Sequence, residues 1–167
     1  MNIFFTNTNP HKCANEHCDV HQIKMILEYT QLLSCAHHLR GSSKEVLAKT
    51  HENHPSAIWV RYSVENYAWL FQCLMQLHKL YSDRTAKVHK LYGMTRTLKY
   101  PPELMTCEGF TTPPVAAPRQ FKSMVGSVGA CVAYQAYLRY KFKEWKSRSK
   151  PIKVEFTCRK PYWLGKE

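Results

Sequence analysis

The chain has 167 residues, which is enough for one domain with a tail, and its hydrophobic content of 44% allows a buried core. That composition excludes an intrinsically disordered chain. Lysine and arginine number 24 against 12 acidic residues, so the net charge of +12 favours an anionic partner such as nucleic acid.

The first half of the chain has helical spacing of its apolar residues. Residues 2–5 are apolar and are expected to form a lone strand or an extended arm on the core. Helices are then expected from residue 15 or 19 to about 39, and over 43–49, 55–81 and 84–92. The helix over 55–81 is apolar around most of its circumference, which predicts a central position in the core.

The second half is punctuated by proline. Residues 93–120 contain prolines that cannot continue a helix, so we expect an extended loop that wraps the core. A loop of that length is unusual unless it binds or covers something. A last helix is expected over 128–147, with room for one short strand over 152–156. These elements predict an all-α, compact helical bundle over 1–150 and a basic C-terminal tail over 151–167.

The seven cysteines are an odd number and include no C-x-x-C pair. Several fall within apolar helical patterns, where a free thiol behaves as a small hydrophobic group. No signal peptide and no apolar run of membrane-spanning length is recognisable, so we expect a cytoplasmic protein with reduced thiols and no membrane partner.

A metal site is the first interpretation of the N-terminal histidines. Cys13, His17 and His21 lie four residues apart, so a continuous helix would place them on one face. Such spacing is common among metal ligands, and Cys18 could add a further sulfur. Pro10 and its turn-forming neighbours interrupt a helix near Cys13, however. The metal site is therefore the lesser alternative, and we expect no cofactor.

The second interpretation needs no metal. Asp19 and His21, together with Lys24 and Glu28, would place a titratable base, a carboxylate and a cation beside one ligand. An enzyme that excises bases needs a carboxylate to stabilise positive charge on the sugar, and an acid or base for the leaving base and the attacking water. The plainer alternative is a part-buried histidine bonded to Asp19, with an ordinary Lys24–Glu28 ion pair.

Residues that could hold nucleic acid are spread over the chain. Asn66 lies among apolar residues, so its amide needs partners either in the core or in a pocket. From residue 139 to 160 there are nine basic and two acidic residues, which is typical either of a phosphate-binding surface or of a solvated helix face. The expected nucleic-acid-binding residues are Lys24, Arg61, Asn66, Arg84, Lys87, His89, Lys90, Lys141 and Arg148.

Several segments together resemble a family of small phage and bacterial proteins. They are residues 1–4, 17–28, 54–61, 66–70, 87–90, 110–114, 133–137 and 145–146. That family is remotely similar to the phage pyrimidine-dimer DNA glycosylases of the endonuclease V type, which are compact and all-helical. Their first helix carries Asp-x-His with a catalytic Glu seven residues after the His, and Asp19, His21 and Glu28 keep this spacing.

The chain departs from those glycosylases at other positions. They use the α-amine of a small second residue as a Schiff-base nucleophile, and Asn2 is a poor candidate for the Met removal that would expose it. Their Glu is flanked by arginines one residue before and three after, where this chain has Leu27 and Gln31. The resemblance therefore implies excision of a base. It does not extend to the lyase reaction or to the arginines that bind DNA in those enzymes.

The leading hypothesis is a helical DNA-processing enzyme, a pyrimidine-directed glycosylase-like hydrolase, in the host cytoplasm if phage-encoded. Glu28 would stabilise charge at the sugar, while His21 with Asp19 would manage protons. Two alternatives stay open: an enzyme acting on a free nucleotide or modified base, and a non-catalytic phage module that sequesters a host protein or nucleotide.

Overall fold

The computed structural model describes residues 1–41 and 45–165, and it confirms the predicted all-α fold. No strand occurs within those two ranges. The helices are α1 (Pro10–Asn15), α2 (Asp19–Arg40), α3 (Pro55–Val60), α4 (Val64–Thr85), α5 (Thr95–Leu98), α6 (Arg119–Lys122) and α7 (Val125–Lys146), with two 3-10 turns, η1 (Tyr92–Met94) and η2 (Tyr162–Leu164).

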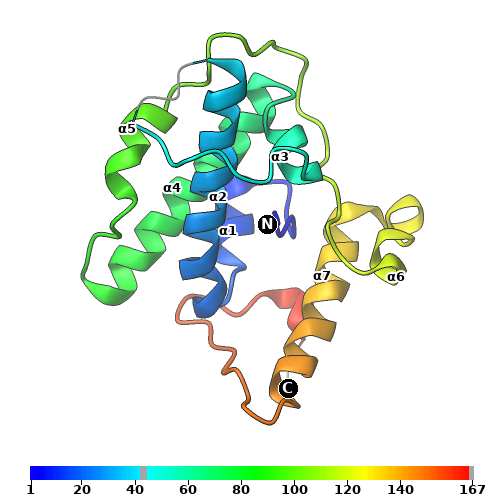
Figure 1. The fold of residues 1–167 in the computed structure, drawn as a ribbon. Coiled ribbons are helices and arrows are strands. Elements are labelled where there is room, and N and C mark those ends of the chain that lie inside the picture. Colours follow the sequence, from blue (N-terminus) through cyan, green and yellow to red (C-terminus); the bar gives the residue numbers. More distant parts are fainter. Residues whose placement is uncertain (42–44, 166–167) are drawn as a thin grey trace.

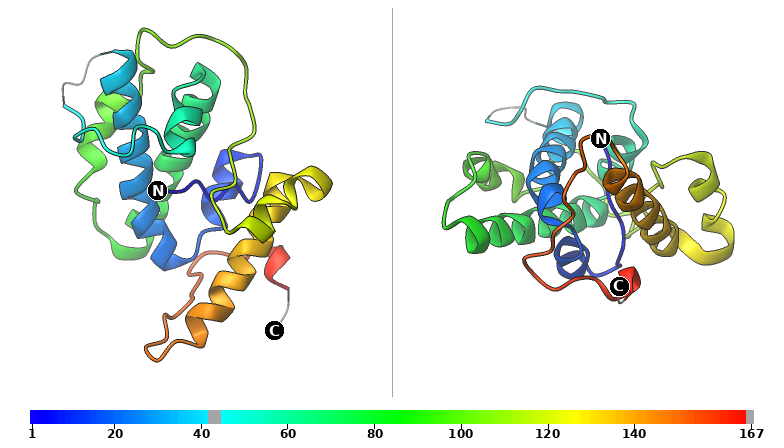
Figure 2. Two further views of the ribbon diagram at one scale, coloured as in Figure 1. Left: turned by 45° about the vertical axis from the view of Figure 1, so that its right-hand side comes forward. Right: turned by 90° about the horizontal axis from the view of Figure 1, so that it is seen from below.

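The core lies where α2 and α4 pack on each other, with α1 against α4 and α3 against α2. Figure 1 shows α2 upright in the centre, α4 and α5 on one side of it and α7 on the other. The start of the chain lies in the space between α2 and α7, which the turned views of Figure 2 also show. Residues 3–5 are buried there, as an extended arm rather than a strand.

Local sequence explains where the helices begin. The Asn9 side chain accepts a hydrogen bond from the Lys12 N–H, and Pro10 occupies the first turn of α1, where its missing donor costs nothing. The same arrangement starts α3, where His54 is the cap and Pro55 follows it. Helix α2 begins with Asp19, whose charge is favourable at a helix N-terminus.

The predicted single helix over 55–81 is wrong, because the chain forms two helices there. Ser63 has an extended backbone (φ −144°), and its hydroxyl accepts from the Asn66 N–H as the cap of α4. The same hydroxyl donates to the Gly109 carbonyl at 2.9 Å. This side chain therefore separates α3 from α4 and attaches the long loop at the break.

Two shorter predicted helices also differ. The helix over 84–92 is wrong because α4 continues to Thr85 and Ala86 then adopts a left-handed conformation (φ 54°) that ends it. Residues 45–49 of the helix predicted over 43–49 are not helical, and its first two residues lie outside the described ranges. The predicted loop over 93–120 is confirmed in its greater part, although η1, α5 and the start of α6 interrupt it.

Helix α7 and the tail complete the fold. Gly129 within α7 has φ 78° and ψ 165°, so a kink divides the helix near its start. The predicted strand over 152–156 is absent: these residues are extended, and their carbonyl at Glu155 accepts from the Asp19 N–H at 2.9 Å. The described tail therefore packs on the N-terminal end of α2. Among the described residues, no helix has the length and apolar character needed to cross a membrane.

Candidate functional site

Asn2 joins three distant parts of the chain. Its backbone N–H donates to Oε2 of Glu28 on α2 at 2.7 Å, and its side-chain N–H₂ donates to the Ala116 carbonyl at 2.8 Å. Its side-chain oxygen lies 2.7 Å from the hydroxyl of Tyr134 on α7. That hydroxyl also accepts from the Ala116 N–H at 3.0 Å. The start of the chain is thus fixed between α2, the long loop and α7.

Glu28 is a largely enclosed carboxylate. Its side chain is 12% exposed, and besides the bond from Asn2 it is 3.4 Å from the ammonium of Lys24, one turn earlier on α2. Lys24 itself is exposed. The two contacts engage different oxygens, Oε2 with the Asn2 N–H and Oε1 with Lys24, so the carboxylate is held in place from both sides.

A cavity of about 600 Å³ opens at Met1, the residue before Asn2, and we call it the N-terminal cavity. It lies between the start of α3, the loop, α6 and α7, next to the chain start marked in Figure 1. Its lining consists of Met1, His54, Pro55, residues 114–118, Lys122 and Tyr137. Met1 is the neighbour of Asn2, so Glu28 and the cavity are separated by a single residue of the arm.

His54 is the titratable base that lines this cavity. Its Nδ1 accepts from the Ser56 N–H at 3.1 Å, which leaves the ring proton of the neutral imidazole on Nε2. Burial holds the pKa of His54 below its usual value, and the positive α-amino group of Met1 adds to that effect, while Glu28 opposes it. His54 is therefore neutral at neutral pH and offers a donor from Nε2.

His21 lies in a closed aromatic cage. Its ring is 4.5 Å from Phe4, 5.0 Å from Trp145 and 5.6 Å from Phe142, measured between ring centroids, and only 1% of the residue is exposed. Its Nδ1 has no hydrogen-bond partner among the described residues. Burial, with repulsion from His17 and Lys141, lowers its pKa well below the usual value, so the ring is uncharged.

The structure does not bring Asp19 to His21. Both carboxylate oxygens of Asp19 accept from Thr157 in the tail, at 3.1 Å from its N–H and 2.6 Å from its hydroxyl. Each residue of a helix is rotated by about 100° from the one before, so residues two apart point to nearly opposite faces. The expectation that Asp19, His21 and Glu28 share one side of α2 is therefore wrong for Asp19, whereas His21 and Glu28 do face the arm.

The alternative metal site is contradicted. The Nδ1–H of His17 donates to the Cys13 carbonyl at 2.8 Å, and its Nε2 is 3.2 Å from the Tyr29 hydroxyl. The Cys13 thiol donates to the Phe4 carbonyl at 3.0 Å. Within residues 1–41 and 45–165, no three histidine, cysteine or acidic side chains gather as metal ligands. Cys13 and His17 instead form core hydrogen bonds, and His21 packs among aromatic rings.

Lys141, one of the predicted nucleic-acid-binding residues, lies near Lys24 and Glu28. The Lys141 ammonium lies over the rings of Trp145 and Tyr137, at 5.2 and 5.6 Å from their centroids. Its pKa lies below the usual range because it is half-buried and because Lys24 is nearby. Beyond the end of α7, Arg148 forms an exposed ion pair with Glu144 at 2.7 Å.

Arg61 and Asn66 have structural contacts. Arg61 donates to the Glu52 carbonyl at 2.6 Å. The fully buried amide of Asn66 donates to the Trp59 carbonyl at 3.0 Å and to the Thr111 hydroxyl at 2.9 Å, and it accepts from the Thr111 N–H at 2.9 Å. Asn66 therefore fixes the loop that borders the N-terminal cavity, and it does not itself line the cavity.

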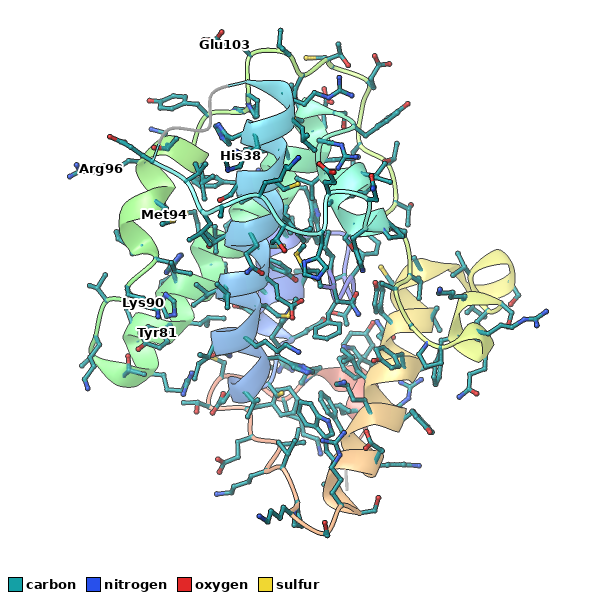
Figure 3. All side chains as sticks on the ribbon, viewed as in Figure 1. His38, Tyr81, Lys90, Met94, Arg96 and Glu103 are labelled. Atoms are coloured by element: carbon teal, nitrogen blue, oxygen red, sulfur yellow. The ribbon has the colours of Figure 1, made fainter. Side chains whose placement is uncertain are left out.

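The remaining predicted cluster is remote. Arg84, Lys87, His89 and Lys90 lie at the end of α4, where His89 packs on Tyr81 with ring centroids 5.1 Å apart. Figure 3 labels Tyr81 and Lys90 on the side of α2 that faces away from α7. These residues do not join Glu28 at the N-terminal cavity.

The sequence alone did not indicate Asn2, Tyr134, Tyr137 or Lys122 as site residues. Asn2 and Tyr134 bind Ala116, and Tyr137 and Lys122 line the same cavity as residues 114–118, the proline-rich part of the loop. The one available signal was the length of that loop, which suggested that it covers something.

No family model, curated protein or solved structure matches this chain. The fold and the site define an all-α domain with a cavity at Met1 that is lined by a neutral histidine and Lys122, and the arm beside it binds an enclosed carboxylate through Asn2.

Proposed function

We propose that this chain is a nucleic-acid-processing enzyme that hydrolyses the bond between base and sugar, with pyrimidines in DNA as its target. The observation that carries the proposal is Glu28, a carboxylate held by the N–H of Asn2, whose neighbour Met1 lines a cavity of about 600 Å³. When a glycosidic bond breaks, positive charge develops on the sugar. A fixed carboxylate next to the sugar stabilises that charge most strongly in the transition state.

His54 takes the place at the departing base that the sequence assigned to His21 and Asp19, as a hydrogen-bond donor. His54 lines the cavity, whereas His21 is caged and Asp19 is bonded to Thr157. In the proposed reaction the base leaves C1′ with the bonding electron pair. Water adds to C1′ and passes a proton to the Glu28 carboxylate, which delivers it to the departing base, while the Nε2–H of His54 donates a hydrogen bond to that base.

The choice of DNA rests on charge. The chain carries +12, and both Lys24 and the half-buried Lys141 flank the Glu28 side of the site. Phosphates on either side of the target sugar would meet these ammonium groups. The preference for pyrimidines is supported by the spacing of His21 and Glu28, which resembles that of the endonuclease V type glycosylases.

The test is excision from a panel of duplexes that carry damaged or modified pyrimidines. We expect Glu28→Gln to lose about 10²–10³ in the rate of excision, since the amide keeps an oxygen for the Asn2 N–H but lacks the charge. Glu144→Gln on α7 is the matched control and should keep the wild-type rate. Absence of excision by the wild-type chain across the whole panel would refute the assignment.

A free nucleotide or modified base is the second candidate, because the N-terminal cavity has the volume of a single-ligand site. A salt titration separates the two candidates. A phosphate-tracking surface loses affinity for DNA steeply as salt rises, whereas a closed site for one nucleotide has a shallow dependence.

A further inference from the structure

A second cavity adjoins the N-terminal cavity and shares Pro55 and Pro114 with it. Its volume is about 420 Å³. We call it the apolar cavity, because aliphatic and aromatic side chains form most of its wall. Its other lining residues are Ile58, Trp59, Tyr62, Thr111 and Thr112.

The wall of the apolar cavity is fixed by hydrogen bonds. The indole N–H of Trp59 donates to the Thr111 carbonyl at 3.0 Å. Asn66 binds the N–H and the hydroxyl of the same threonine. The polar groups of Thr111 are therefore engaged within the wall. A cavity preformed in this way binds a rigid ligand without paying for loop ordering.

Two side chains on the rim are exposed although they are large and apolar. Ile58 is 47% exposed and Tyr62 is 51% exposed. The exposed ring of Tyr62 beside a fixed indole is suited to a flat ring, because base–aromatic stacking does not depend on hydrogen-bond readout. The neighbouring N-terminal cavity adds the polar side chains His54 and Lys122. Together the two cavities fit a flat apolar ring joined to a polar, anionic group.

We propose that the apolar cavity receives the base of the target nucleotide, turned out of its strand, while the sugar lies over the N-terminal cavity near Glu28. This inference rests on the proposed function. The bond between base and sugar then lies at the boundary formed by Pro55 and Pro114. A mismatched or unpaired base costs less to turn out of the stack. The chain should therefore bind a strand with an unpaired base more tightly than a perfect duplex.

The first experiment measures dissociation constants of the full chain by fluorescence anisotropy at one fixed salt concentration. The probes are a duplex with one mismatched pyrimidine and the same duplex fully paired. In Tyr62→Ala we expect affinity for the mismatched duplex to fall about tenfold, the order of one lost base–aromatic stack, with the paired duplex unchanged. Ile58→Ala should act in the same direction. Tyr162→Ala and Val88→Ala are matched controls, since both side chains are exposed elsewhere.

The second experiment locates the base directly. A 5-iodouracil at the mismatched position crosslinks on irradiation to an aromatic ring stacked on it, and mass spectrometry maps the attached peptide. We expect the adduct within residues 55–62. An adduct confined to residues 81–92, where Tyr81 and Tyr92 lie beside basic residues, would overturn the proposal. So would unchanged affinities in both rim variants.

The outcomes separate this inference from the proposed function. A crosslink at 55–62 without excision of any base would retain the base cavity and reject the glycosylase. Excision that depends on Glu28 but is unaffected by Tyr62→Ala or Ile58→Ala would retain the glycosylase and reject the base cavity. If a free mononucleotide displaces the mismatched duplex at equal concentration, the cavity takes its base from a free nucleotide, and the proposal that the base comes from a strand is wrong.

Discussion

Replacing Asn66 with alanine tests whether the wall of the apolar cavity depends on one buried amide. The change removes two donated bonds, to the Trp59 carbonyl and the Thr111 hydroxyl, and leaves the Thr111 N–H without its acceptor. An orphaned buried N–H costs about 1–3 kcal/mol, and each ordinary bond contributes about 1 kcal/mol. The Trp59 carbonyl still accepts from the Tyr62 N–H at 3.2 Å, which limits the loss there. We expect the free energy of unfolding to fall by about 2–4 kcal/mol.

The assay is urea unfolding followed by tryptophan fluorescence, with the loss taken from the midpoint at unchanged m value. Gln72→Ala, at an exposed position of the same helix, is the control and should change stability by less than about 0.5 kcal/mol. A comparably small effect of Asn66→Ala would refute the reasoning, because the loop would then be held by other contacts. In the folded variant we also expect weaker binding of the mismatched duplex, since the loop is freer.

Three further predictions concern pH, salt and the tail. Burial lowers the pKa of His17 from 6.5 to about 4, so the unfolded chain binds the proton more readily than the folded one. The free energy of unfolding therefore has its full value above pH 6.5 and falls by about 3 kcal/mol as the pH drops toward 4. Urea midpoints across that range should show this slope, and His17→Gln should reduce it. Lys141→Gln should lower the slope of log affinity for DNA against log salt by about one, whereas Lys12→Gln on α1 should leave the slope unaltered. Asp19→Ala removes both bonds from Thr157, so we expect a loss of about 1–2 kcal/mol and faster proteolysis of the tail, and equal cleavage rates would contradict that role.

The helical class followed from periodicity, but the boundaries depended on contacts that no local pattern contains. Ser63 looked like one more helical residue, yet its hydroxyl caps α4 and binds Gly109, 46 residues away. Ala86 carries no stop signal, and it ends α4 through its left-handed backbone. Helix α2 was predicted almost to its last residue because its apolar face and Gly41 act locally.

The site was predictable only in part for the same reason. Glu28 was identified from its spacing to His21, and it binds Asn2, the neighbour of the cavity residue Met1. The angular step of a helix already separates Asp19 from His21, so that error could have been avoided from geometry alone. The hydrogen bond between Asn2 and Tyr134 could not have been predicted, because it depends on how α7 returns to the start of the chain.

The hydrogen bonds of Asn2 also determine when the site can exist. They span 26 residues to Glu28, 114 to Ala116 and 132 to Tyr134. Contacts of such separation form only after long segments have been closed, which makes them late events in folding. During synthesis the N-terminal cavity cannot be completed until α7 has left the ribosome, although α1 to α4 can pack earlier. We therefore expect that a nascent chain forms its core well before the N-terminal cavity is complete.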